Sequence, residues 1–281
     1  SSIKNKQITH AQFILKFKSL STLKLLSPEF SRAHEEGDIH IHDLDFLSLT
    51  TTCCQIDIKK LFNGGFNTGH GFLREPNSIQ CASALACIAI QSNQNDQHGG
   101  QSIPNFEYGL APGVARSFIK NIDLALDMRD APEDFRGEVK SALRAYSFPT
   151  GEYASFRSIL NEEGLAFVRE TLTRRLPAAE ADHVIEKAIA KTDRDTYQAM
   201  EGLLHNLNTM HSRAGAQVPF SSINYGTDTS PEGRMVIKNT LLAEDAGLGN
   251  GETPIFPIHI FKVREGLVQN IFLYQWLLNL Y

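Results

Sequence analysis

Three consecutive segments near the end of the chain decide the fold: VPFSSINY at residues 218–225, PEGRMVIKNTLLAEDA at 231–246 and IFPIHIFKV at 255–263. The first predicts a strand, and the second predicts a helix that begins with a proline and ends at Gly247. The third predicts a strand that is apolar on both sides, which is typical of burial within a parallel sheet. A strand, a helix and a second strand form a β/α unit, so the predicted fold class is α/β.

The middle third of the chain, upstream of this unit, is predicted to be helical. Apolar residues recur there at helical spacing, and the residues between them are mostly charged. Thr192 and Asp195 resemble a capping box, so we expect one helix to end at Lys191 and another to begin at Thr192. The helices predicted along the whole chain cover residues 10–26, 27–36, 78–94, 113–130, 132–146, 162–175, 179–191 and 192–212.

Two segments nearer the amino end predict extended backbone. Residues 38–46 alternate polar and apolar side chains up to His42, and the alternation changes phase at Asp43, which indicates a bulge or the end of a strand. Residues 50–57, TTTCCQID, also predict extended structure. The glycine-rich residues 63–71 predict a loop, and they match neither of the common phosphate-binding glycine patterns cleanly.

Composition and charge exclude several classes of protein. The 281 residues are 42% hydrophobic and carry a formal net charge of −5, which fits one large or two small globular domains and gives no basic stripe for a nucleic-acid backbone. We expect neither a leader nor a stretch that spans a bilayer, and we therefore expect the protein to lie in the cytoplasm. The four cysteines show neither C-x-x-C spacing nor the density of a disulfide scaffold, which favours a reducing compartment.

Two histidines are candidates for metal binding. His40 and His42 stand two apart on one side of an extended segment, as the imidazole pairs of several zinc enzymes do. Taken alone they indicate a metal-dependent hydrolase, but a histidine at the end of a strand can equally be hydrogen-bonded to a neighbouring carboxylate. Possible further ligands are Asp43, Asp45, His70 and His98.

Adjacent thiols and a polar segment are the other candidates for chemistry. On a strand Cys53 and Cys54 would face opposite sides, so at most one of them would face a given pocket. A thiol at this place could be a nucleophile, a redox partner or a packing residue. Residues 205–220 are unusually polar for a helix that leads into a strand, and Asn208, Gln217 and Arg213 offer amide and guanidinium groups to a ligand. Spacing alone does not decide between these roles and structural ones.

Five segments taken together resemble the anaerobic, class III, glycyl-radical ribonucleoside-triphosphate reductases. They occur in the order of that family and cover roughly Ser27 to Gly266. The segments are AHEEGDIHIHDLD at residues 33–45, CCQID at 53–57, QNDQHGGQSI at 94–103, HNLNTMHSRAG at 205–215 and GLGN at 247–250.

The resemblance implies a fold, a reaction and partners. The fold is part of a glycyl-radical-type α/β barrel with many surrounding helices, and the reaction replaces the 2′-hydroxyl of ribonucleoside triphosphates with hydrogen, for DNA synthesis. In the family a glycyl radical generates a thiyl radical on a finger-loop cysteine, and a second cysteine, matched here by Cys53 and not Cys54, takes part in reduction. The implied partners are a second copy of the chain, a radical-SAM iron–sulfur activating enzyme that uses S-adenosylmethionine, formate as reductant, and ATP or deoxynucleotide effectors.

The resemblance also implies two sets of binding residues and no metal ligand in this chain. His40, His42, Asn208 and Gln217 are expected near the substrate. Residues 74–94 match the region of dimer contact and effector binding, to which we assign Arg74, Asn77, Ser78 and Gln91. The chain departs from the family at Arg74 and Asn77, where some relatives have an acidic and a basic residue.

The resemblance gives expected boundaries as well. Residues 1–266 are predicted to be the amino-terminal part of the catalytic barrel domain, with a poor match over 1–26, and residues 267–281 a non-matching tail from truncation or a frameshift. The finger-loop cysteine, radical glycine and carboxyl-terminal zinc site are expected outside this chain, so we expect the chain alone to reduce no nucleotide. The alternatives are a non-catalytic nucleotide-binding or dimerisation remnant, the metal-dependent hydrolase, and a related glycyl-radical acyltransferase.

Overall fold

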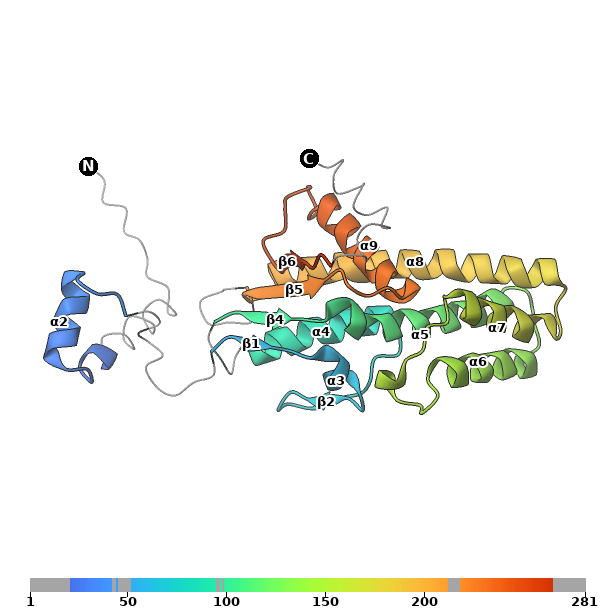
Figure 1. The fold of residues 1–281 in the computed structure, drawn as a ribbon, viewed down its shortest axis with the longest axis horizontal. Coiled ribbons are helices and arrows are strands. Elements are labelled where there is room, and N and C mark those ends of the chain that lie inside the picture. The colour runs from blue at the N-terminus through green and yellow to red at the C-terminus, as the bar shows by residue number, and fades with distance from the viewer. Residues whose placement is uncertain are drawn as a thin grey trace.

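Four parallel strands, neighbours in space in the same order as in the sequence, form the main sheet (Figure 1). The computed structural model describes residues 21–41, 44, 52–94, 97, 99–211 and 218–264. The strands are β1 (Cys54–Gln55), β4 (Gln101–Ile103), β5 (Ser221–Tyr225) and β6 (Ile258–Phe261). Helices connect them, so the predicted α/β class is confirmed. The order is that of a barrel wall, and the closed barrel itself stays a prediction.

A second, two-stranded sheet pairs β2 (Phe66–Asn67) with β3 (Phe72–Leu73) across the glycine-rich segment that was predicted to be only a loop.

Most of the predicted helices are present. The helices are α2 (Pro28–Glu36), α3 (Ile58–Phe62), α4 (Ile79–Asn93), α5 (Phe106–Asp127), α6 (Glu133–Ser147), the short 3-10 helix η2 (Tyr153–Ser155), α7 (Glu162–Thr173), α8 (Ala178–Thr209) and α9 (Pro231–Ala246).

Helix α5 forms the centre of the core. Its buried side chains Phe106, Leu110, Val114, Phe118 and Ile122 recur every fourth residue, and the helix packs against α4, α6, α8 and α9. Each such side chain contributes about 2 kcal/mol when it leaves water. The helix begins seven residues before the predicted start at Gly113. The sequence concealed this start because Pro112 and Gly113, usual signs of a helix end, here lie inside the helix.

Helix α8 corrects the prediction of two helices that meet at Thr192. The side chain of Thr192 is fully buried, and its hydroxyl donates to the carbonyl oxygen of Ala188, 2.7 Å away and one turn earlier. The same hydroxyl accepts from the Asn121 side chain on α5 at 3.0 Å. Thr192 therefore links two helices inside the core and does not begin a new one.

Two predicted strands differ from the observed structure. Residues 38 and 39 lie in a bend and residues 40 and 41 in irregular backbone, not in a strand, and most of the rest of the predicted strand at 38–46 lies outside the described residues. Strand β6 is parallel to β5, as predicted, but it is not buried on both sides. Ile258 and Ile260 are 57% and 43% exposed, so helices cover one face of the sheet and leave the other face open.

Candidate active site

A cavity of about 690 Å³ lies over the amino ends of the four strands and the adjoining open face of the sheet. Its size is that of pockets that hold small-molecule ligands. All four strands contribute to its wall, so the parallel register brings segments that are far apart in the sequence to one place. The lining residues are Cys53 to Gln55, Gly99 to Ser102, Phe220 to Ser222, Phe256 and Ile258.

Cys53 lies at the edge of this cavity, immediately before β1. It is exposed, and its sulfur accepts a hydrogen bond from the backbone N–H of Gly100 at 3.4 Å. Gly99 lies directly against it, with a φ of +99°. A Cβ atom at that position would come within 2.9 Å of the Cys53 sulfur, so only glycine leaves room for the thiol.

Cys54, the first residue of β1, also lines the cavity but is held differently from Cys53. The Asn93 side chain on α4 donates to the Cys54 sulfur at 3.0 Å and to the Gln101 side-chain oxygen at 2.8 Å. Gln101 in turn donates to the Gln94 side chain at 2.8 Å. Burial raises the pKa of the Cys54 thiol, which keeps it protonated and less nucleophilic.

The open face of the sheet is polar at its centre and apolar at its rim. Register places Gln55, Ser102, Ser222 and Ile258 in one row across the four strands. The Ser102 hydroxyl donates to the Asn224 side-chain oxygen at 3.0 Å, and the amide N–H₂ of Asn224 can still bind a ligand. Such a row of hydroxyl and amide groups suits a ligand that carries several hydroxyls.

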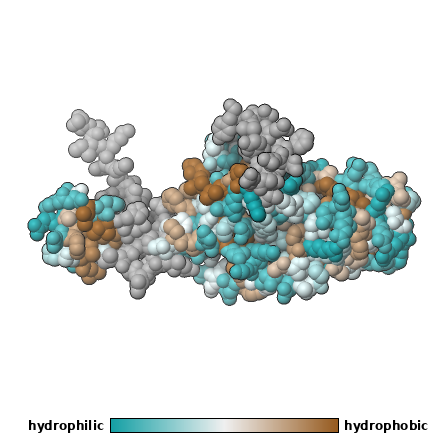
Figure 2. Space-filling model, viewed as in Figure 1, coloured by the Kyte–Doolittle hydropathy of each residue, from teal (hydrophilic) through white to brown (hydrophobic). Residues whose placement is uncertain are grey.

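Aromatic and aliphatic side chains form the apolar rim. Phe220 and Phe256 pack edge to face with ring centroids 5.1 Å apart, and Phe220 remains 50% exposed. Figure 2 shows hydrophobic surface on this part of the molecule, beside the amino ends of β5 and β6. An exposed apolar rim beside polar groups is typical of a surface that binds a ligand or another part of a protein.

The substrate residues expected from the resemblance are only partly brought to this cavity. The Asn208 side chain accepts from the backbone N–H groups of Ile255 and Phe256, at 2.8 and 3.1 Å, and donates to the Phe256 carbonyl oxygen. It therefore fixes the cavity wall at Phe256. His40 is exposed, beyond α2, with its ring 5.7 Å from that of His34. His42 and Gln217 lie outside the described residues.

Three of the four residues assigned to the effector region meet at the start of α4. Arg74 and Asn77 are exposed, and Ser78 caps the helix by accepting from the backbone N–H of Cys81 at 3.2 Å. Gln91 lies thirteen residues further along α4, about 20 Å from Ser78, since a helix rises 1.5 Å per residue. A single nucleotide base therefore does not contact both ends of the set.

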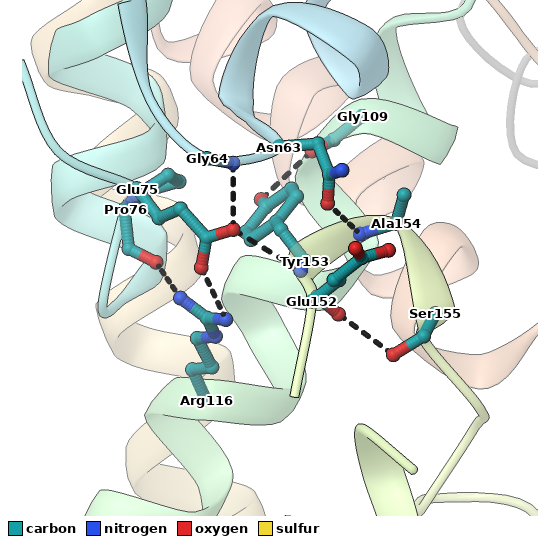
Figure 3. Close-up of polar contacts among 10 residues, drawn as sticks. All are labelled: Asn63, Gly64, Glu75, Pro76, Gly109, Arg116, Glu152, Tyr153, Ala154 and Ser155. Atoms are coloured by element: carbon teal, nitrogen blue, oxygen red, sulfur yellow. Dashed lines mark hydrogen bonds and ion pairs between the residues drawn. The ribbon is translucent and has the colours of Figure 1, made fainter. Parts of the chain in front are cut away.

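Glu75 organises the backbone around this start of α4 (Figure 3). Its carboxylate accepts from the N–H of Gly64 at 2.8 Å, from the Arg116 guanidinium at 3.0 Å and from the N–H of Tyr153 at 3.3 Å. Arg116 also donates to the Pro76 carbonyl oxygen at 2.7 Å. The pair therefore ties the glycine-rich hairpin, the segment before α4, and η2 to the central helix α5. Neither residue stood out in the sequence, because their partners lie about 40 positions away.

Neither a cluster of metal ligands nor a helix that could span a membrane is present in the described part of the chain. Within this part, no three side chains of histidine, cysteine, aspartate or glutamate lie close enough together to form a metal site. Four of the suggested ligands, His42, Asp43, Asp45 and His98, fall outside it. No helix among the described residues is both long and apolar enough to cross a membrane.

Comparison with known proteins decides the family. The sequence model of the family described as anaerobic ribonucleoside-triphosphate reductase matches residues 2–279. The chain belongs to this family. The anaerobic ribonucleoside-triphosphate reductase of enterobacteria phage T4 is 29% identical to it over 248 residues, and that of Escherichia coli K12 is 28% identical over 247 residues. The predicted family of oxidoreductases is thereby confirmed.

The chain matches only a part of these reductases. The two alignments take in 87% and 86% of this chain but 32% and 27% of the relatives, so the chain spans about a third of their length or less. The crystal structure of the anaerobic ribonucleotide reductase from Thermotoga maritima in complex with dATP and CTP aligns with 85% of this chain and 34% of that one, with a TM-score of 0.47 and 12% identity.

Proposed function

We propose that this chain forms the part of an anaerobic ribonucleoside-triphosphate reductase that holds the reducing thiol, Cys53, beside the ribose of the substrate. Replacement of a hydroxyl by hydrogen takes up two electrons and two protons and releases water. A single thiol gives one electron and one proton, so formate, which releases two of each when it is oxidised to carbon dioxide, would supply the net reduction with Cys53 as the thiol beside the ribose. The observation that carries the proposal is the placement of Cys53 at the edge of an open, polar sheet face. There its sulfur is exposed, whereas the Cys54 sulfur is bound by Asn93.

We assign the cavity to the ribose and not to the triphosphate. Ser102 and Ser222 line the cavity with hydroxyl groups, and Asn224, which is hydrogen-bonded to Ser102 on the same face of the sheet, adds an amide group for a sugar. No lysine or arginine is among the described residues that line the cavity, and phosphate groups usually bind such cations. The sequence places Arg213 and Gln217 on the segment that leads into β5, and we expect them to extend this substrate site.

The remaining parts of the reaction follow from the family resemblance. A glycyl radical, formed by an activating enzyme, would generate a thiyl radical on a cysteine that lies elsewhere in a full-length reductase. That thiyl radical would remove a hydrogen atom from the ribose. Formate is the expected reductant, and a second copy of the chain and nucleotide effectors are the expected partners at the start of α4. We expect the protein to act in the cytoplasm, and we expect residues 1–266 to be the amino-terminal part of its catalytic barrel domain.

Substitution of the two thiols tests the proposal. In the full-length, activated protein, Cys53→Ser should lower formate-dependent deoxynucleotide formation by at least about 100-fold, because it removes the reducing group. The matched variant Cys54→Ser should keep at least about a tenth of the activity, because Asn93 can donate to a hydroxyl as well. Substrate binding, measured separately, should stay unchanged in both variants. Equal activity of the two variants would show that Cys53 is not the reducing thiol, and nucleotide binding without turnover in the unaltered protein would favour the non-catalytic binding module.

A further inference from the structure

A second cavity, of about 560 Å³, lies in a groove between α5 and α8, and it shares no residue with the cavity at Cys53. One wall of the groove is basic, with Arg129, in the turn after α5, joined by His183, Lys187, Lys191 and Arg194 from α8. The four residues of α8 recur at helical spacing over eleven positions, so they form a stripe about 16 Å long on one side of the helix.

The other wall of the groove is apolar. Leu124 and Ala125 of α5 line it together with Met128, the residue that follows the helix, and Leu124 and Met128 are 44% and 79% exposed. Apolar surface of Met128 and Leu124 that leaves water on binding stabilises a complex, and the flexible thioether side chain of Met128 adapts to planar and irregular ligands. The groove therefore pairs an adaptable apolar surface with a row of cations.

Three acidic side chains beside this groove already have partners. Asp123 is bound by Arg136 and Lys140 at 2.9 and 3.1 Å, and Asp127 is bound by the same arginine. Asp195, at the end of the groove, is bound by Lys191. Neither Lys187 nor Arg194 has an ion-pair partner among the described residues, so the groove keeps a net positive charge.

We propose that the α5–α8 groove binds a small molecule that combines phosphate groups with a planar apolar part, as nucleoside polyphosphates do. The phosphates lie on Lys187 and Arg194, since guanidinium and ammonium groups bind phosphate oxygens strongly. The planar part covers Leu124 and Met128. The volume of the groove suits such a ligand and is too small for a folded partner. This site is separate from the active site and from the exposed residues at the start of α4.

Photolabelling of the full-length protein with 8-azidoadenosine triphosphate tests the proposal, because the labelled peptide reports the position of binding whatever other nucleotide sites exist. We expect label on peptides that contain residues 121–129 or 183–194, and displacement of that label by excess inorganic triphosphate. The double substitution Lys187→Ala with Arg194→Ala should lower this label by at least about tenfold.

Two controls make the result decisive. Lys60→Ala removes an exposed lysine outside the groove, whose side chain is 88% exposed, and should leave the label unchanged. Lys187 and Arg194 are exposed, so the double variant should keep the far-UV circular dichroism spectrum and the melting temperature of the parent. The proposal is overturned if these peptides carry no label, if the label persists in the double variant, or if inorganic triphosphate does not displace it.

Discussion

Glu75 shows how a single carboxylate can hold together backbone segments that have no regular structure of their own. Burial by itself raises the pKa of this carboxyl group, but the hydrogen bonds from Gly64, Arg116 and Tyr153 lower it below its ordinary value. The ionised form is therefore the one that the fold stabilises. Its side chain is 23% exposed and that of Arg116 is 18% exposed, so the pair is better shielded from solvent than a surface ion pair.

The substitution Glu75→Gln should lower the free energy of unfolding by about 1–3 kcal/mol at neutral pH, because two backbone N–H groups and a guanidinium lose a charged acceptor. Since the pKa is lower in the folded than in the unfolded state, the stabilisation is present above the unfolded value of about 4.3 and is lost as pH falls through the folded value. Urea unfolding at a series of pH values measures both effects.

A neighbouring glutamate provides the control for this prediction. The side chain of Glu152 is exposed, in the same cluster, and only its backbone carbonyl oxygen accepts a bond there, from the Ser155 hydroxyl at 2.7 Å (Figure 3). Glu152→Gln should therefore change the free energy of unfolding by less than about 0.5 kcal/mol. If Glu75→Gln and Glu152→Gln have the same small effect at every pH, the Glu75 carboxylate does not hold this region together.

At the scale of elements, the continuity of α8 can be tested with proline. A helix that began at Thr192 would place Asp193 at its first position, where proline is tolerated. In the observed helix Asp193 is an interior residue, so Asp193→Pro should cost about 3 kcal/mol or more, through a lost hydrogen bond and a clash with the preceding turn. Asp193 also binds Lys238 and Asn239 on α9. Asp193→Ala separates the loss of these contacts from the backbone effect, and equal melting temperatures for the two variants would contradict a continuous helix.

The elements that the sequence predicted correctly are those set by local pattern. Helix α4, predicted over residues 78–94, and helix α9, with its Gly247 stop, follow from periodicity and capping residues within each segment. In each case the information lies within about twenty consecutive residues. The prediction that Cys53 and Cys54 would face opposite sides of a strand was wrong in part, because Cys53 lies just before β1 and both cysteines line the same cavity.

Features that depend on packing between distant segments could not be predicted. The bond between Ser102 and Asn224 joins residues 122 positions apart, and it becomes visible only once β4 and β5 are in register. The predicted break at Thr192 also separated Lys187 from Arg194, so the basic stripe of α8 was hidden although every member of it is plain in the sequence. Thr192 satisfies its hydroxyl inside the core, and no local pattern reports that.

At the scale of the whole molecule, the open face of the main sheet is the feature that remains to be explained. Among the described strands, β1 and β6 are edge strands, and Ile258 and Ile260 of β6 stand exposed on the face opposite the helices. Exposed apolar side chains beside an unpaired edge favour association between molecules. In the barrel that the family resemblance predicts, the same face would point inward and be covered by further strands.

The substitution Ile260→Lys should therefore be beneficial in the 281-residue chain and harmful in the full-length protein. In the 281-residue chain it should lower self-association, measured by light scattering, with little change in the free energy of unfolding, because a lysine on an open face stays hydrated. In the full-length reductase it should cost several kcal/mol, because the barrel would bury an unpaired charge. Ile255→Lys, at a side chain 73% exposed before β6, is the matched control and should be tolerated in both forms. A full-length protein that tolerates Ile260→Lys as well would show that this face is not enclosed, and the barrel prediction would then be wrong.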